Sequence, residues 1–234
     1  MTKLDNEIRH LLFGPDGNRR YAKEHGISFE EAYDITAKKI IDIIRWCFVD
    51  HPIDELSFAL ILDYNLNRED THIIAGLNAA KNFFQYVSES DLLREFNLQL
   101  RTVGDLRSLF ERYDINTADL DTVLEEGRTN QGKRVNILAP YSGSEELRRA
   151  WILCIKDYAE ISLENLALRC SIPPVTHAIR TGQPSGIVRL SAYYPGIEQA
   201  RILSTPTYPQ DFTRKELDSM INIFLTLKDS YDKL

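Results

Sequence analysis

Short apolar runs alternate along the chain with longer segments in which apolar residues recur at helical spacing. A nearly continuous apolar run is typical of a strand in a parallel sheet, because both faces of such a strand are buried. The pattern therefore predicts several buried strands separated by amphipathic helices. The expected strands cover residues 11–13, 56–62, 98–103, 135–139, 175–179 and 202–204.

Three of the helical segments begin with Ser or Thr followed three residues later by Glu. This spacing is typical of a capping box, in which each side chain satisfies a backbone N–H group at the start of a helix. These pairs are Ser28 with Glu31, Ser142 with Glu145, and Thr213 with Glu216. The helices are expected over residues 28–46, 70–88, two segments within 106–126, 142–158, 163–169 and from 213 onward.

Alternating strands and helices predict an α/β fold with a mostly parallel sheet surrounded by helices. The 234 residues contain no internal repeat and no linker, so a single domain over residues 1–234 is expected. Ligands bind beyond the carboxyl ends of the strands in such sheets. Asp16, Asn65 and Arg180 each follow an expected strand, so we expect them at the same edge.

Composition and charge limit which binding partners and which cellular compartment are expected. The net charge of −7, without any basic run, argues against a nucleic-acid-binding protein. Cys47, Cys154 and Cys170 are scattered, which favours a reducing compartment and no structural metal site. The polar residues 1–9 do not resemble a signal peptide, and no apolar stretch could span a bilayer. A cytoplasmic protein is expected, with membrane-surface contact conceivable through an apolar substrate or product.

The segment from Gly14 to Ala22 carries the most distinctive chemistry. Asp16 and Gly17 stand beside the adjacent pair Arg19 and Arg20, at the expected start of a helix. A helix N-terminus and two guanidinium groups favour an anion, and glycine lets a phosphate approach the backbone. The acidic neighbour would oppose a phosphate unless a divalent cation lay between them. The segment predicts a magnesium-assisted diphosphate site, although local chemistry alone also fits a simple turn with a solvated arginine pair.

A second basic cluster follows the fifth expected strand. Arg180, Arg189 and Ser191 flank a loop rich in Gly and Pro. Guanidinium and hydroxyl donors suit a second diphosphate, whereas a surface loop with a structural arginine pair is the simpler interpretation of this cluster alone. Two anion clusters and one acid together suggest two diphosphate substrates meeting at one metal ion.

These motifs resemble those of the cis-prenyltransferases, the undecaprenyl diphosphate synthase family. Residues 16–22 closely match the family signature D-G-N-R-R-W-A. Residues 179–191 resemble I-R-T-G-G-E-x-R-x-S, with three extra residues between the two arginines. Residues 141–143 resemble the start of N-Y-G-G-R, and residues 208–212 resemble W-P-D-F. Motif order and spacing agree from about residue 10 to residue 215.

The resemblance implies a parallel sheet of about six strands surrounded by helices, and transfer of an allylic prenyl group from its diphosphate. It also implies a homodimer and a Mg²⁺ ion bound by Asp16. By similarity, one set of residues would hold the allylic diphosphate and another the diphosphate of the second substrate. The first set is Gly17, Asn18, Arg19 and Arg20, and the second is Arg180, Arg189 and Ser191.

Several positions depart from the family pattern. Asn65 and Arg68 remain, but Tyr64 and Leu66 stand where Glu and Trp are usual. Tyr33 replaces a histidine and is kept as a candidate substrate-binding residue. Two further positions differ: Phe29 replaces an arginine, and the late metal-binding Glu maps near residues 199–201, with Glu198 out of register.

Part of this pattern resembles the branch typified by cyclolavandulyl and lavandulyl diphosphate synthases. Members of that branch also carry the Tyr and lack the Glu before Asn, and they keep an aromatic-aromatic-Pro segment like residues 193–195. They join prenyl units head-to-middle. They retain the late Glu, which this chain lacks, so the resemblance to the branch is imperfect.

Three hypotheses follow from the resemblance. The first is head-to-middle condensation with dimethylallyl diphosphate as acceptor, and longer allylic diphosphates as further substrates. The second is head-to-tail elongation with isopentenyl diphosphate, and the third is a non-catalytic binding member. For catalysis we expect Asp16, Asn65 and Arg68 to act, with the substrate's own diphosphate taking the proton. Aromatic and small side chains of the 70–88 helix could line a channel for the prenyl tail or be plain core, namely Ala79, Ala80, Phe83 and Phe84.

Overall fold

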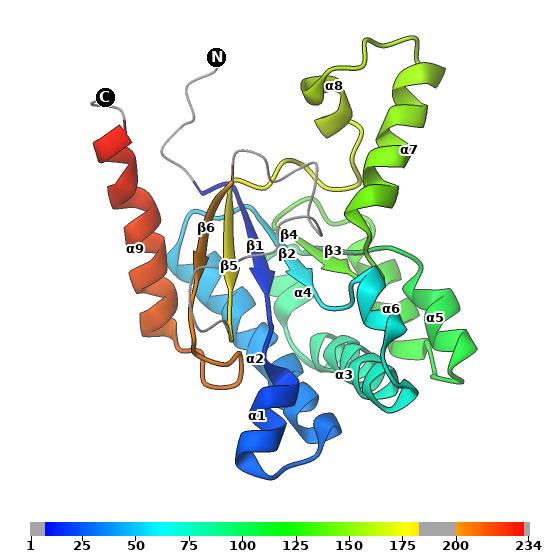
Figure 1. Cartoon of the computed structure of the whole chain (residues 1–234), viewed down its shortest axis with the longest axis vertical. Coiled ribbons are helices and arrows are strands. Elements are labelled where there is room, and N and C mark those ends of the chain that lie inside the picture. Colours follow the sequence, from blue (N-terminus) through cyan, green and yellow to red (C-terminus); the bar gives the residue numbers. More distant parts are fainter. Residues whose placement is uncertain (1–7, 183–199, 232–234) are drawn as a thin grey trace.

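Six parallel strands form one sheet in the computed structural model, which describes residues 8–182 and 200–231. The strand order is β3-β4-β2-β1-β5-β6, and every neighbouring pair is parallel. The expected α/β class with about six strands is confirmed (Figure 1). The strands are β1 (His10–Gly14), β2 (Glu55–Ala59), β3 (Gln99–Val103), β4 (Arg134–Leu138), β5 (His177–Arg180) and β6 (Arg201–Ser204).

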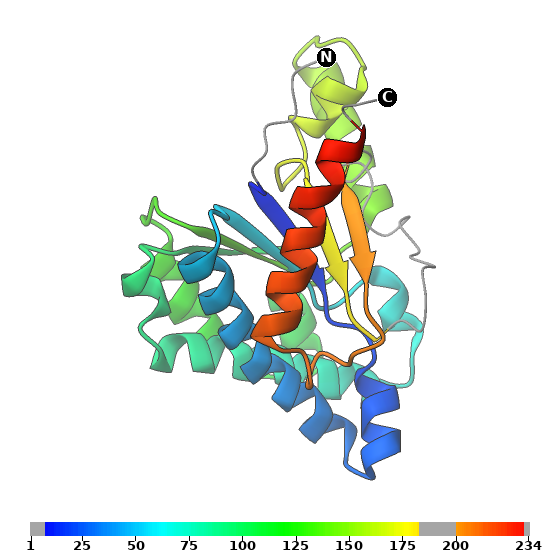
Figure 2. The same ribbon diagram turned by 90° about the vertical axis from the view of Figure 1, so that its left-hand side faces the viewer.

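Helices surround the sheet, and α7 with α8 projects away from it (Figures 1 and 2). The short α1 lies just beyond the carboxyl end of β1 (Figure 1). No helix within the described residues has the length and apolar character needed to cross a membrane. The helices are α1 (Asn18–His25), α2 (Phe29–Asp50), α3 (Asp70–Glu89), α4 (Leu92–Glu95), α5 (Leu106–Arg112), α6 (Ala118–Gly127), α7 (Gly143–Lys156), α8 (Leu163–Ala167) and α9 (Arg214–Tyr231), with a 3-10 helix η1 (Asp63–Asn67).

The expected helix starts are present. The Ser28 hydroxyl accepts the backbone N–H of Glu31 at 3.0 Å. Before α9 the bonding is reciprocal, because the Glu216 carboxylate accepts the N–H of Thr213 at 3.0 Å and its own N–H donates to the Thr213 hydroxyl at 3.2 Å. Before α7, the Ser142 hydroxyl accepts the backbone N–H of Glu145 at 3.5 Å. Local sequence therefore sets these three starts.

The second strand is shorter than its apolar run predicts. The run extends to Leu62, but β2 ends at Ala59. The chain then turns into η1, where the Asn65 side chain accepts the backbone N–H of Leu62 at 2.9 Å. Leu62 forms only an isolated bridge with Tyr141. The run stays buried after leaving the sheet, which is why periodicity alone misplaces the boundary.

Alternate strand side chains point to the two faces of the sheet. Phe13 and Phe58 point to the face covered by α2, α3 and α9, and pack there in one large core cluster. Phe83 and Phe84 of α3 belong to the same cluster and are fully buried. The interpretation of these aromatics as core is confirmed, and they do not form a channel wall.

A polar network occupies the other face near the amino ends of the strands. Glu55 is only 2% exposed and pairs with Arg101 at 3.2 Å and with Arg134 at 2.8 Å. Asn136 is fully buried and donates to Glu55 at 2.8 Å and to the Ser57 hydroxyl at 2.9 Å. Because every partner is engaged, the network fixes how β2, β3 and β4 align.

We expect Glu55→Ala to lower the free energy of unfolding by about 3 kcal/mol, because it leaves buried donors without an acceptor. The matched control is Asp54→Ala, whose carboxylate is 68% exposed and pairs with Lys133. That change should cost less than about 1 kcal/mol. Urea unfolding followed by circular dichroism measures both, and equal losses would contradict a stabilising role for the network.

Candidate active site

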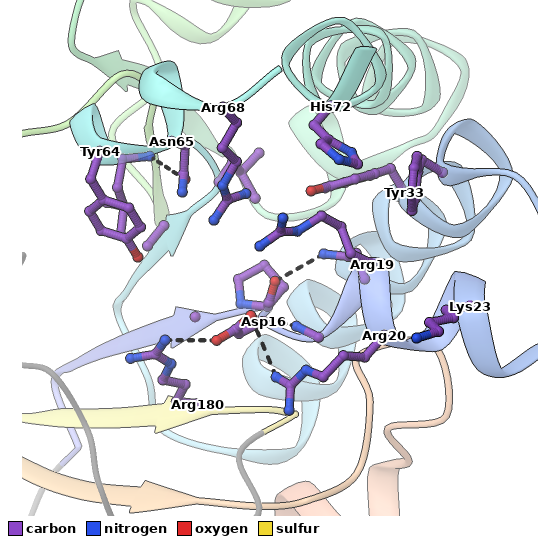
Figure 3. A pocket seen from close by; sticks show the side chains of 18 of the residues that line it. Asp16, Arg19, Arg20, Lys23, Tyr33, Tyr64, Asn65, Arg68, His72 and Arg180 are labelled. Atoms are coloured by element: carbon purple, nitrogen blue, oxygen red, sulfur yellow. Dashed lines mark hydrogen bonds and ion pairs between the residues drawn. The ribbon is translucent and has the colours of Figure 1, made fainter. Parts of the chain in front are cut away.

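A cavity of about 610 Å³ opens at the carboxyl ends of β1, β2 and β5 (Figure 3). In the register of the sheet, Gly14 at the end of β1 lies opposite Arg180 at the end of β5. The structure thereby brings Asp16, Asn65 and Arg180 to one cavity, at the sheet edge where we expect them. Its lining comprises Gly14, Pro15, Asp16, Gly17, Asn18, Arg19, Arg20, Lys23, Ile27, Phe29, Tyr33, Ala59, Leu60, Leu62, Tyr64, Asn65, Arg68, His72 and Arg180.

Two glycines let the loops after β1 and β5 pack against each other. Gly17 has a φ of 108°, and a Cβ there would lie 2.6 Å from the Tyr208 ring. Gly182 has a φ of 66°, and a Cβ there would lie 2.3 Å from the backbone oxygen of Asp16. Only glycine combines these positive φ angles with so close an approach. The contact holds the Asp16 loop beside the end of β5.

The Asp16 carboxylate is held by positive groups. It accepts a hydrogen bond from the Arg180 guanidinium at 2.7 Å and lies 3.8 Å from that of Arg20. Its other oxygen accepts the backbone N–H of Gly17 at 2.6 Å. Arg180 is 17% exposed, so this charged bond is stronger than a pair in open solvent. The two motifs therefore meet in one electrostatic cluster.

The cavity as a whole favours anions. Its cationic side chains are those of Arg19, Arg20, Lys23, Arg68 and Arg180, whereas Asp16 is the one carboxylate among the described lining residues. No side chain caps α1, so the N–H groups of its first turn remain available beside the cavity. A helix N-terminus with several guanidinium groups is suited to phosphate oxygens.

Asn18 has a different position from the one its motif suggests. Its side chain is buried, and its amide oxygen accepts hydrogen bonds from the Thr36 hydroxyl at 2.5 Å and the Gln210 amide at 2.8 Å. Its amide nitrogen donates to the Pro15 carbonyl at 3.1 Å. The side chain thus joins α1 to α2 and to the segment before α9. The Asn18 side chain therefore positions this loop, and its backbone N–H lies in the first turn of α1.

Tyr33 and Arg68 form one wall of the cavity (Figure 3). Burial raises the pKa of the Tyr33 hydroxyl, and this outweighs the opposing effect of the Arg68 and Arg19 charges. The hydroxyl therefore stays protonated at neutral pH and can donate to an anion in the cavity.

Asn65 faces the same space from η1. Its amide oxygen is fixed by the backbone N–H of Leu62, which leaves the amide nitrogen directed toward the cavity (Figure 3). Tyr64, which stands where the family pattern has Glu, lies at the rim and is 48% exposed.

Two polar residues of the cavity lining, Lys23 and His72, were not singled out from the sequence. Lys23 lies four residues after Arg19, on the same face of α1, and this spacing could have identified it. His72 lies in the first turn of α3, four residues after Arg68. Its ring packs edge-on against Phe29, with centroids 4.4 Å apart. Nothing local in the sequence distinguishes His72 from a surface histidine.

A small apolar recess of about 20 Å³ adjoins the main cavity. Ile61, Leu66, Ile73 and Gly76 line its inner part. A Cβ on Gly76 would meet no atom within 4 Å, so this glycine in the interior of α3 leaves open space. The recess lies nearer the start of α3 than the residues that the sequence suggested for a channel.

The described lining of the cavity offers a metal ion one carboxylate, that of Asp16. The described residues contain no group of three or more His, Cys, Asp or Glu side chains that could hold a metal. Arg201, at the position of the late Glu, donates to the backbone oxygen of Phe224 at 2.6 Å and so contacts α9 instead of the cavity. Several positions singled out in the sequence lie outside the described residues, namely Arg189, Ser191, 193–195, Glu198 and Gln199.

Fold and site together define an α/β protein with a strongly cationic cavity, ending in an apolar recess, at the carboxyl edge of a parallel sheet. Residues 15–231 match the family model described as putative undecaprenyl diphosphate synthase. The chain therefore belongs to this family of prenyltransferase enzymes, as its motifs led us to expect.

Individual relatives agree with this membership. An isoprenyl transferase from Wolinella succinogenes is 26% identical over 226 residues, covering 94% of each chain. Lavandulyl diphosphate synthase from Lavandula x intermedia, solved with dimethylallyl diphosphate, aligns with a TM-score of 0.78 at 17% identity, covering 94% of this chain and 96% of that one. A probable undecaprenyl diphosphate synthase from Campylobacter jejuni aligns with a TM-score of 0.74 at 23% identity, covering 93% and 95%. These two structures share the fold, and their similar scores do not separate the branches.

We expect Gly182→Ala to destabilise the site, because its Cβ would collide with the Asp16 backbone. Gly26→Ala is a matched control, since Gly26 has nearly the same φ, 64°, but open space around it. The control should cost about 1 kcal/mol from backbone strain alone. Gly182→Ala should cost at least about 1 kcal/mol more and reduce binding of inorganic diphosphate, measured by thermal unfolding and calorimetry. Equal effects of both changes would contradict the close approach.

Proposed function

We propose that the chain transfers an allylic prenyl group between two prenyl diphosphates, by head-to-middle condensation with dimethylallyl diphosphate as acceptor. The observation that carries this proposal is the meeting of the two arginine motifs at Asp16, with Arg20 on one side and Arg180 on the other. A single anion would need only one of these motifs. Apolar side chains of the main cavity, among them Phe29, Leu60 and Leu62, give a place for a prenyl group.

In this proposal the allylic diphosphate lies at the N-terminus of α1. The first-turn N–H groups, Arg19 and Arg20 hold its oxygens and stabilise the negative charge that builds up as it leaves. The diphosphate of the acceptor lies beside Arg180, with Arg189 and Ser191 as further proposed contacts. Arg68, Tyr33 and the Asn65 amide hold the acceptor so that its double bond faces the allylic carbon.

Asp16 is the proposed Mg²⁺ ligand. Mg²⁺ is commonly held by one or two carboxylates together with substrate phosphates and water, so a single carboxylate beside a diphosphate site fits it. When bound, the ion would supply positive charge to the departing diphosphate. The arginines around Asp16 share its negative charge until a diphosphate occupies the site.

The recess beside Gly76, about 20 Å³, has room for about one water molecule, so a prenyl group would lie mainly in the larger cavity. The described residues place no open channel between α2 and α3, because Phe83 and Phe84 fill the core there. The space beside Gly76 is the one apolar extension that the described cavity lining shows. Because the described residues show no long apolar channel, short prenyl groups fit the cavity better than long chains, which supports the head-to-middle proposal over chain elongation.

Incubation of the protein and Mg²⁺ with dimethylallyl diphosphate alone, and then with isopentenyl or geranyl diphosphate added, tests the proposal. Product from dimethylallyl diphosphate as acceptor is expected, identified by mass spectrometry after removal of the diphosphate. A strict requirement for isopentenyl diphosphate would instead show head-to-tail elongation. No product from any combination would contradict both.

We expect Asn65→Ala to lower turnover by about 100-fold while changing substrate binding by less than threefold, because a misplaced acceptor slows the reaction more than it weakens binding. Steady-state kinetics and calorimetry with a thio-diphosphate analogue measure the two effects. Asn67→Ala is the control in the same turn, since Asn67 is exposed and does not line the cavity.

Asn65→Asp tests the roles of the amide oxygen and the amide nitrogen separately. It keeps an oxygen for the Leu62 N–H but removes the donor that faces the cavity. We expect turnover as low as that of Asn65→Ala. We also expect the thermal unfolding temperature of Asn65→Asp to equal that of the unchanged protein. Unchanged turnover in either variant would contradict the role of Asn65.

The homodimer and the membrane-surface contact that the sequence suggests stay predictions.

A further inference from the structure

His72 lies where the polar and apolar parts of the cavity meet. It lines both the main cavity and the recess beside Ile73 and Gly76. Under the proposed function, diphosphate oxygens lie on the cationic side and prenyl carbons on the apolar side. The carbons that react, and the proton that must then leave, are therefore expected at this junction.

The two nitrogens of the His72 ring have different surroundings. Nδ1 is buried and has no hydrogen-bond partner. Nε2 is not among the buried unpartnered atoms of the described residues, and no protein group bonds to it there. Figure 3 shows the ring directed from α3 toward Tyr33 and Arg19. The ring packs edge-on against Phe29, and a tautomer with the proton on Nδ1 leaves the Nε2 lone pair for a group in the cavity.

The other described lining groups are poorer proton acceptors. The Asp16 carboxylate is engaged by Arg180 and Arg20 on the polar side. Tyr33 keeps its proton at neutral pH because burial raises its pKa. Arginine and lysine carry only donors.

We propose that His72 is the general base of the reaction, an inference that rests on the proposed function. The new carbon–carbon bond leaves a carbocation on the acceptor. A neighbouring C–H bond then breaks, its electrons form the new double bond, and its proton passes to Nε2 of His72. The proton is later released to the departing diphosphate or to water. This assignment competes with the expectation from sequence that the substrate's own diphosphate takes the proton.

His72→Gln tests the assignment, with His25→Gln as the control. His25 is exposed at the end of α1, bonds to the Tyr21 carbonyl and does not line the cavity. The measurements are kcat and KM from pH 5 to pH 9, with binding of a thio-diphosphate analogue measured separately. The charged and titratable groups that share the cavity, and must be unchanged in both proteins, are Asp16, Arg19, Arg20, Lys23, Tyr33, Tyr64, Arg68 and Arg180.

We expect His72→Gln to lower kcat by about 100-fold or more, a typical loss for a general base, with KM and analogue binding within threefold. The dependence of kcat on pH should differ between His72→Gln and the unchanged protein, whereas that of His25→Gln should not. His72→Phe, which preserves ring packing against Phe29, should show the same loss at an unchanged unfolding temperature.

A kcat within threefold of the unchanged protein, with the same dependence on pH, would overturn the assignment and leave the diphosphate as acceptor. Loss of analogue binding without a separate loss in kcat would overturn it as well, since it would indicate a positioning role. If the unchanged protein binds the analogue but makes no product, the proposed function fails first, and the base assignment fails with it. The two failures are thus distinguishable.

Discussion

The close packing of the β1 and β5 loops is the constraint on which the site depends. Parallel pairing aligns Gly14 with Arg180, and Gly17 with Gly182 lets the two backbones approach where a Cβ could not fit. The ion pair between Asp16 and Arg180 follows from that register. Residues separated by 164 positions thereby become parts of one electrostatic cluster, without either motif needing to change its local conformation.

Much of this arrangement follows from the sequence. The apolar runs identify all six strands, and three capping pairs set helix starts, because both signals depend on local chemistry. The meeting of Asp16, Asn65 and Arg180 follows from one rule about the edges of parallel sheets. Where the signal was not local, prediction failed. Leu60 to Leu62 remain apolar after leaving the sheet, so the end of β2 was placed too late.

Individual side chains within the site were harder to place. Asn18 belongs to the signature motif, yet its amide is used by Thr36 and Gln210, which come from other parts of the chain. His72 shows the opposite case, a cavity residue that no motif indicated. Helical periodicity predicts α3, but it does not predict which of its polar residues faces a cavity. A motif specifies which residues gather at a site. Tertiary contacts decide which atoms of those residues remain available.

The charge distribution of the cavity agrees with the proposed binding of two diphosphates in an acidic protein. Asp16 lowers the mutual repulsion of Arg20 and Arg180 while the site holds no diphosphate. A bound diphosphate offers the same guanidinium groups more acceptor oxygens than one carboxylate does, so these contacts can be exchanged rather than lost. The exchange would release Asp16 for a cation, whose charge offsets the added phosphates. In the proposed reaction, one carboxylate would thus stabilise the empty site and then complete the loaded one, with no second carboxylate among the described lining residues.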